Sequence, residues 1–162
     1  MGFEVALGAG ELKINSVSMH TAAWRIRNVS LLQFDSALRG EYVTIPGKDG
    51  EDPVPMRNTS AQWSLDFQMV GDVDHTGAAY AASGIYRAEQ IGLASNMNYL
   101  RTNVLTGRTL TGNRTRAATL QVPGEGSVRT ADIHCWLVPG ARQDWRLWEG
   151  QLVIRIPAGA FL

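Results

Sequence analysis

One segment near the middle of the chain has a large apolar residue at every second position. In Ala61–Val70 these residues are Trp63, Leu65, Phe67 and Met69, and most of the residues between them are polar. Successive side chains of an extended strand project to opposite faces, so this pattern predicts a strand with one buried face. Such a strand needs further strands or a helix to complete a core.

Five other segments show the same alternation and are predicted to be strands. They are Glu11–Val17, Trp24–Val29, Arg114–Val122, Val128–Val138 and Trp145–Ile156. Turn residues separate the last three, with Pro123, Gly124 and Gly126 in the first gap and Pro139 with Gly140 in the second. Proline and glycine favour tight turns, so we expect these three strands to form an antiparallel meander.

The period changes from two to about three and a half in Tyr86–Leu105. The apolar residues Leu93, Met97, Leu100 and Val104 are spaced by four, three and four, which places them on one face of a helix. Strands, one helix, then strands again predict a mainly β fold. We expect a β-sandwich or split barrel with the helix packed against one face.

The length of 162 residues predicts a single domain spanning residues 1–162, and 44% apolar residues are enough for a core. Cys135 is the only cysteine, so no disulfide can form within the chain, and its apolar surroundings predict a buried thiol. No apolar run is long enough to span a bilayer, and the N-terminus does not resemble a signal peptide. No membrane partner is expected.

The charges balance, with 15 basic and 15 acidic residues. Nucleic-acid binding requires an excess of Lys and Arg on one face, so no direct nucleic-acid partner is expected. Thirteen of the basic residues are arginines, and only Lys13 and Lys48 are lysines. Arginine pairs bidentately with carboxylates, so this bias indicates either subunit interfaces or a GC-rich genome.

No pattern in the sequence predicts catalysis, a metal or a cofactor. His20, His75 and His134 are far apart in the sequence, and Asp72–His75 lacks the glycine and terminal glutamate of a calcium loop. The segment Gly47–Gly50 lacks the strand, spacing and helix of a phosphate-binding loop. The chain is therefore not expected to be an enzyme.

The five tryptophans fall into two groups. Trp63 and Trp136 lie on predicted strands and are expected in the core. A second group follows Gly140 and mixes aromatic with charged residues: Arg142, Asp144, Trp145, Arg146 and Trp148. Aromatic and arginine side chains are enriched where subunits meet, so this cluster is a candidate subunit contact, and the alternative is a sugar-stacking surface.

Several segments together resemble a known family. They are His20–Ile26, Leu38–Gly40, Thr44–Gly50, Asn96–Arg101 and Ile156–Phe161. This set is similar to minor tail proteins of long-tailed phages, especially those infecting actinobacteria, and to the N-terminal domain of the phage distal tail protein. Larger members of that family carry an additional C-terminal domain, which is not expected in this chain.

The resemblance implies a structural virion protein made in the host cytoplasm and located at the tail tip. It would form a homo-oligomeric ring, expected to be a hexamer, that joins the tail tube protein to the tail-tip hub, with the tape measure protein in the lumen. Tail tube and tail terminator proteins share this plan and remain alternatives. A carbohydrate-binding β-sandwich module is the alternative from another class.

The family has no catalytic residues to transfer. What the resemblance implies instead is that the Ile45–Gly47 turn, with Asp49 and Gly50, is a structural and ring-contact loop. This turn lies in the segment from Leu38 to Asn58, which is polar, rich in glycine and proline and long enough to reach a neighbour. Its candidate contact residues are Arg39, Pro46, Lys48, Asp49 and Glu51. A closed ring needs two different faces of each subunit to meet, and a long loop can supply one of them.

Overall fold

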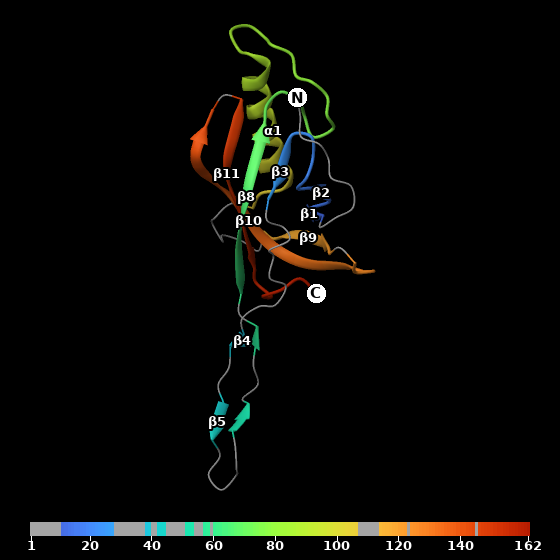
Figure 1. Ribbon diagram of the computed structural model, residues 1–162, viewed down its shortest axis with the longest axis vertical. Helices are drawn as coiled ribbons and strands as arrows, with labels where there is room; N and C mark the ends of the chain where they lie inside the picture. The colour runs from blue at the N-terminus through green and yellow to red at the C-terminus, as the bar shows by residue number, and fades with distance from the viewer. Residues whose placement is uncertain are drawn as a thin grey trace.

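A computed structural model describes residues 11–27, 38–39, 42–44, 51–53, 57–58, 60–106, 114–122, 124–144 and 146–162. In this part of the chain a seven-stranded sheet is covered by one helix, α1 (Ala88–Asn103) (Figure 1). The strands of the sheet are β1 (Leu12–Ile14), β2 (Val17–Ser18), β3 (Trp24–Ile26), β8 (Ala61–Val70), β9 (Arg116–Gln121), β10 (Val128–Gln143) and β11 (Leu147–Ile156). Two further pairs form separate small sheets, β4 (Leu38–Arg39) with β7 (Arg57–Asn58) and β5 (Tyr42–Thr44) with β6 (Glu51–Pro53).

The large sheet is antiparallel throughout and has the strand order β2-β1-β9-β10-β11-β8-β3. Its longest strand, β10, pairs with β9 up to Ile133 and with β11 from His134 onward, so it connects two parts of the sheet. Twist accumulates along such a long strand and curls the sheet into a half-barrel. The predicted mainly β fold with one packed helix is confirmed, and the curled single sheet is of the split-barrel type.

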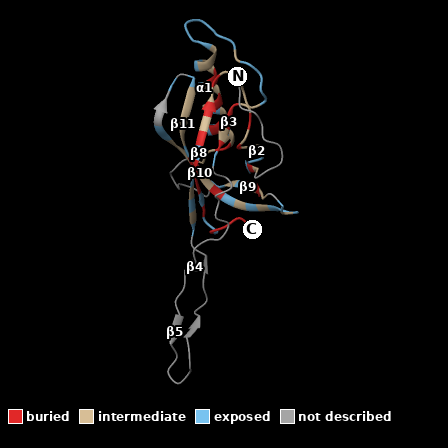
Figure 2. Ribbon diagram, in the orientation of Figure 1, coloured by how far each residue is buried: buried red, intermediate tan, exposed pale blue. Residues whose placement is uncertain are grey.

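The predicted central strand is confirmed as β8, and it forms the middle of the core. Leu65, Phe67 and Met69 are buried, as are Trp24 and Ile26 of the neighbouring strand β3. Figure 2 shows the buried residues concentrated between α1 and the sheet. Alternation therefore identified the inward face of β8 correctly, because each inward residue meets a buried residue of another element.

The first predicted strand is wrong, because Glu11–Val17 contains a hairpin rather than one strand. β1 and β2 are joined by Asn15 and Ser16, whose φ angles are 51° and 64°. Two consecutive positive φ values define the two-residue hairpin turn whose twist matches that of the strands. Asparagine tolerates this conformation better than most residues, so the chain reverses where the apolar pattern had indicated a continuous strand.

The meander of β9, β10 and β11 is confirmed, but one of its predicted turns is wrong. Gly124, with φ 87°, lies in the turn between β9 and β10 as expected. Pro139 and Gly140 instead lie inside β10, next to a register shift between Pro139 and Gln143. The backbone of Pro139 faces the side of β10 away from β11, so its missing N–H costs no ladder hydrogen bond and β10 continues through the proline.

The predicted helix is confirmed as α1, which lies very close to the end of β8. Leu100 is buried, and Leu93 and Met97 pack against the core from the same face of the helix. Gly92 faces Gly71, and a Cβ atom on either glycine would overlap the backbone of the other segment. Two glycines in contact thus set the distance between the helix and the sheet.

The segments that carry the family resemblance have structural roles where they are described. The Thr21 hydroxyl accepts hydrogen bonds from the backbone N–H groups of Ala23 and Trp24, both 3.2 Å long, and the Trp24 indole donates to the Ser18 carbonyl. Near the C-terminus, Phe161 is buried and stacks on Trp63 with ring centroids 5.6 Å apart. These motifs fix the ends of the sheet and carry no exposed reactive group.

Candidate subunit interface

The segment predicted to be a contact loop contains a β-ribbon. Strands β4 and β7 pair Arg39 with Arg57, and β5 and β6 pair Tyr42 with Pro53 and Thr44 with Glu51. The two pairs lie beyond the Ala61 end of β8, away from the seven-stranded sheet (Figure 1). The segment predicted to supply a ring-contact loop therefore forms paired strands where it is described, and its contact role stays a prediction.

Between the two strand pairs, one side of the ribbon has one residue more than the other. Three positions separate Arg39 from Tyr42 on one side, whereas four separate Pro53 from Arg57 on the other. Of the five predicted contact residues in this region, Arg39 lies in β4 and Glu51 in β6. Pro46, Lys48 and Asp49 lie outside the described residues.

The second predicted contact cluster forms the turn between β10 and β11. Arg142 lies in β10, and the N–H of Asp144 donates to the Leu147 carbonyl at 2.9 Å, which closes the turn. Asp144 and Arg146 are exposed, whereas Trp145 lies outside the described residues. The described part of this cluster thus supplies charged groups at an exposed sheet corner.

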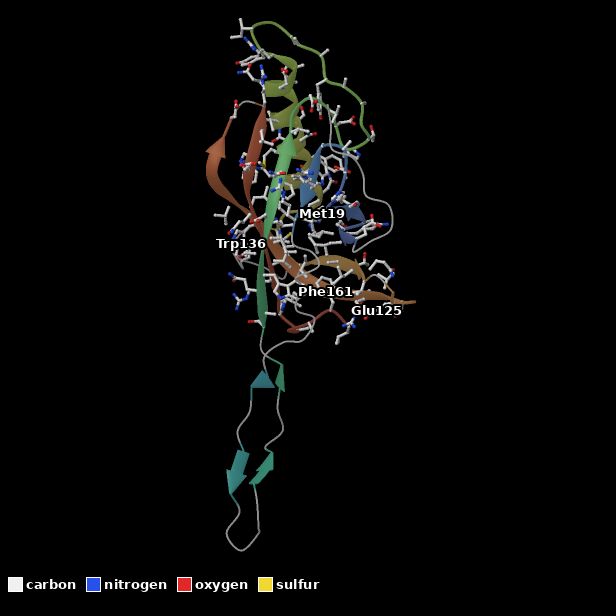
Figure 3. The ribbon with its side chains drawn as sticks, in the orientation of Figure 1. Met19, Glu125, Trp136 and Phe161 are labelled. Carbon is white, nitrogen blue, oxygen red and sulfur yellow. The ribbon has the colours of Figure 1, made fainter. Side chains whose placement is uncertain are left out.

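Trp136 and Trp148 are both half-buried, so neither has the environment expected from the sequence. Trp148, predicted to be exposed, is half-buried against Phe67, with ring centroids 5.9 Å apart in an edge-to-face arrangement. Trp136, predicted to be core, lies outside the core cluster and lines a surface groove, and in Figure 3 it lies across β8 from the buried Met19. The alternation of side chains along the strands explains both environments. Trp148 projects from the same face of β11 as the buried Leu152, whereas Trp136 projects from the face of β10 opposite to the buried Cys135.

A groove of about 1050 Å³ lies between the C-terminal half of α1 and strands β9, β10 and β11. Its apolar lining includes four residues that pack against the core, Met97, Leu105, Leu137 and Trp148. Trp136 and Pro139 complete the apolar lining. Its charged lining is entirely basic among the described residues, with Arg101, Arg114 and Arg116. The groove therefore combines aromatic contact area with positive charge.

Two of the three arginines are exposed and one is anchored. Arg101, in the last turn of α1, and Arg114, before β9, are exposed. Arg116 donates from its guanidinium to the Thr102 carbonyl at 3.0 Å. Within the part of the chain that the structure describes, no carboxylate lies within ion-pair distance of any of these three arginines.

One edge of β10 faces this groove. At Cys135 this edge of β10 is occupied, because the Thr106 N–H donates to the Cys135 carbonyl and the Cys135 N–H donates to the Thr106 hydroxyl. Backbone groups of a strand alternate between its two sides, so the next groups on the same side belong to Leu137 and Pro139. No described strand pairs with β10 on that side beyond Ile133.

A turn at the opposite end of the sheet from the ribbon exposes two apolar residues. Ser83 and Tyr86 exchange backbone hydrogen bonds of 3.2 and 3.0 Å around Gly84, whose φ is 58°. The turn leaves Ile85 90% and Tyr86 60% exposed. The sequence analysis assigned Tyr86 to the start of the helix and missed this surface, although the Ser83-Gly84 pair is a turn signal.

The histidines lie on different elements and have structural surroundings. His20 forms a bridge with Arg25, His134 lies in β10, and His75 stacks on Tyr99 with ring centroids 4.4 Å apart. Beside His75, the Asp74 carboxylate accepts hydrogen bonds from Thr76, whose hydroxyl is the largest cause of its lowered pKa. Among the described residues no group of three metal-binding side chains comes together.

Cys135 is fully buried, and its thiol donates to the Val104 carbonyl at 3.1 Å. Burial raises the pKa of this thiol from 9.0 to about 11. Because the thiolate is the reactive form, we expect no labelling of the native protein by a thiol reagent at pH 8, and full labelling after denaturation. Fast labelling of the native protein would contradict this buried position.

The raised pKa of Cys135 also predicts a loss of stability in alkali. The unfolded thiol ionises near pH 9.0 and the folded one near 11, so folding favours the protonated form. This contribution is complete below pH 9 and is lost as the pH rises to about 11. The free energy of unfolding, measured by urea titration from pH 8 to 11, should therefore fall more steeply in the native sequence than in Cys135→Ala.

Neither a protein-family profile nor a curated protein sequence matches this chain. Among solved structures, the chain is similar to the Dit protein of SPP1, described as a paradigm of the hub adsorption apparatus in phages that infect Gram-positive bacteria. The TM-score is 0.48 and the sequence identity 15%, over 94% of this chain and 51% of the SPP1 protein. The chain thus spans about half the length of that protein. No helix among the described residues is long and apolar enough to cross a membrane.

Proposed function

We propose that this chain is a structural subunit of a phage tail that assembles with copies of itself into a ring. The observation that carries the proposal is the β-ribbon of β4 to β7, which lies away from the seven-stranded sheet (Figure 1). A ribbon of this kind is stable only when it packs against another surface. The family resemblance of the sequence supports the same role.

The proposed ring is a hexamer at the tail tip, between the tail tube protein and the tail-tip hub, with the tape measure protein in its lumen. Ring closure requires a heterologous contact, in which one face of each subunit meets a different face of the next. The ribbon and the turn between β10 and β11 are the proposed contact segments. In this role the chain acts by binding and positioning, and no enzymatic step is proposed.

The mass of the purified protein in solution, measured by light scattering, tests the proposal. Closed rings of about six subunits with an open centre, imaged by electron microscopy, are the expected result. Long filaments would favour the tail tube alternative, because the same heterologous contact generates open polymers when it does not close. A monomer at every concentration up to about 1 mM would contradict self-assembly.

Deleting residues 47–51 should impair assembly much more than folding. The deletion removes residues between β5 and β6 together with Glu51 of β6, whereas the described core lies in the seven-stranded sheet and α1. The melting temperature should change by less than roughly 3 °C, while the fraction of assembled protein falls at least tenfold. Unchanged ring formation by the deletion variant would exclude the ribbon as a contact.

A further inference from the structure

The face of the seven-stranded sheet away from the core carries an ordered array of polar side chains. On β8, Asp66 and Gln68 alternate with buried core residues, so their side chains project from this outer face. The segments on both sides of β8 place further polar residues level with these two. The first row is Arg25, Gln68 and Glu149, and the second row is Arg27, Asp66 and Gln151.

Hydrogen bonds through Gln68 hold the array together. The Oε1 atom of Gln68 accepts from Nε of Arg25 at 3.0 Å and from a guanidinium N–H of Arg27 at 3.1 Å. Its Nε2 atom donates to the Glu149 carboxylate at 2.7 Å. One amide thus links side chains across three neighbouring segments. Groups that are ordered in advance lose little conformational freedom when a ligand binds to them.

A pocket of about 570 Å³ lies over this array, within the size range of small-molecule sites. Its polar lining is Arg27, Asp66, Gln68, Glu149 and Gln151. The rest of its described lining is Phe67, Val138, Pro139, Gly140 and Gly150. A Cβ atom on Gly140 would lie only 2.9 Å from the Glu149 carbonyl oxygen. The floor of the pocket is therefore open where position 140 has no side chain.

The lining favours a neutral ligand that has several hydroxyl groups. Within the described part of the array two carboxylates balance two arginines, so neither an anion nor a cation is preferred. Carboxylates only accept hydrogen bonds, guanidinium groups only donate them, and amides do both. A hydroxyl group can donate one hydrogen bond and accept two, so it matches every polar group of the lining. Sugars combine many hydroxyl groups with a small ring whose C–H groups can contact an apolar floor.

We propose that this pocket is a binding site for a neutral sugar. Asp66 and Glu149 accept hydrogen bonds from its hydroxyl groups, and Arg27 and Gln151 donate to them. Val138 and Pro139 contact the C–H groups of the sugar ring. The site lies within one chain, so it does not depend on self-assembly and goes beyond the proposed function.

Saturation-transfer NMR on the full chain tests the site, with glucose, galactose, mannose, rhamnose and N-acetylglucosamine as probes. The pocket is open to solvent and removes only part of a ligand from water, so we expect at least one of these sugars to bind with a Kd on the order of 1 mM. Because ligand and site carry no net charge, 0.5 M salt should change this Kd by less than about twofold. Loss of binding in salt would show that ions compete for the site and would overturn the neutral ligand.

The site variant is Asp66→Ala with Gln151→Ala, which alters one cross-strand pair of β8 and β11. It removes two polar groups of the lining, so sugar affinity should fall at least roughly tenfold. The matched control is Gln62→Ala with Arg155→Ala, a second cross-strand pair of the same strands, exposed and outside the pocket. Both variants remove one charged group and one amide, and the control should bind sugar like the native protein. Thermal unfolding checks that both variants are folded.

The pattern of binding across these proteins decides the inference. Saturable binding that is lost in the site variant and kept in the control would support the pocket. No saturable binding of any of the five sugars would overturn it, and so would an equal loss in both variants or unchanged binding by the site variant. Light scattering of the same samples measures ring formation separately, so the sugar site and the proposed function can fail independently.

Discussion

Replacing Asn96 by leucine is expected to lower the free energy of unfolding by about 4 kcal/mol. Asn96 is 1% exposed, and its amide donates to the carbonyls of Val70 and Val73 at 2.9 and 3.0 Å. Its side-chain oxygen accepts from the Tyr80 hydroxyl at 2.9 Å. Leucine has nearly the same size, so the variant keeps the volume but leaves three buried or half-buried polar groups without their partner.

The same helix offers a matched control. Asn98 has the same side chain in α1 but is exposed, so Asn98→Leu should change the unfolding free energy by less than about 0.5 kcal/mol. Tyr80→Phe removes one of the three hydrogen bonds and should cost about 1 kcal/mol. Urea unfolding followed by tryptophan fluorescence measures all three variants. Equal stability of the two asparagine variants would exclude the proposed role of Asn96.

Replacing Gly92 by alanine should destabilise the protein by about 3 kcal/mol and lower its melting temperature by roughly 10 °C. In an exposed helix this change stabilises by about 1 kcal/mol, because alanine has the higher helix propensity. Here the added Cβ would overlap the Gly71 carbonyl and approach Cδ2 of Tyr80 to 2.6 Å. The helix would have to move away from β8, which would open the core on both sides of the contact.

A second glycine provides the control for this prediction. Gly126 has no atom within 4 Å of a Cβ built on it, and its φ is not in the left-handed region. Gly126→Ala should therefore alter stability by less than about 0.5 kcal/mol. Differential scanning calorimetry of both variants makes the comparison. A melting temperature for Gly92→Ala at or above that of the native protein would show that α1 can shift without cost.

The periodic spacing of apolar residues correctly predicted one strand and the helix. Strand β8 has the bounds expected from its alternation, and α1 has the apolar face expected from the spacing of Leu93, Met97 and Leu100. Both patterns arise because side-chain direction follows directly from backbone geometry within one element. The buried Cys135 was predicted from its apolar surroundings, and on β10 it is in phase with the buried Ile133.

Predictions failed where pairing with a distant segment overrides the local pattern. Pro139 and Gly140 form a turn in most sequences, but here Pro139 pairs with Gly150 and a bulge lets β10 continue. Asn15 and Ser16 interrupt an apparent strand because Ile14 is held against Ala118 of β9 while Val17 folds back beside it. In both places the local conformational preference contributes about 1 kcal/mol of free energy, which is less than the free energy gained from strand pairing and from burial of apolar side chains.

The sequence by itself determined the class of the fold, the inward face of its longest uninterrupted strand and the position of its helix. It also identified the segment that contains the ribbon and the absence of any recognisable catalytic pattern. Only the tertiary structure decided that Arg101, Arg114 and Arg116 share a groove with Trp136 and Trp148. The reason is physical. The periodic spacing of apolar residues indicates which face of a single helix or strand is buried. A groove forms where separate elements diverge, so its lining and its charge depend on contacts between residues that are far apart in the sequence.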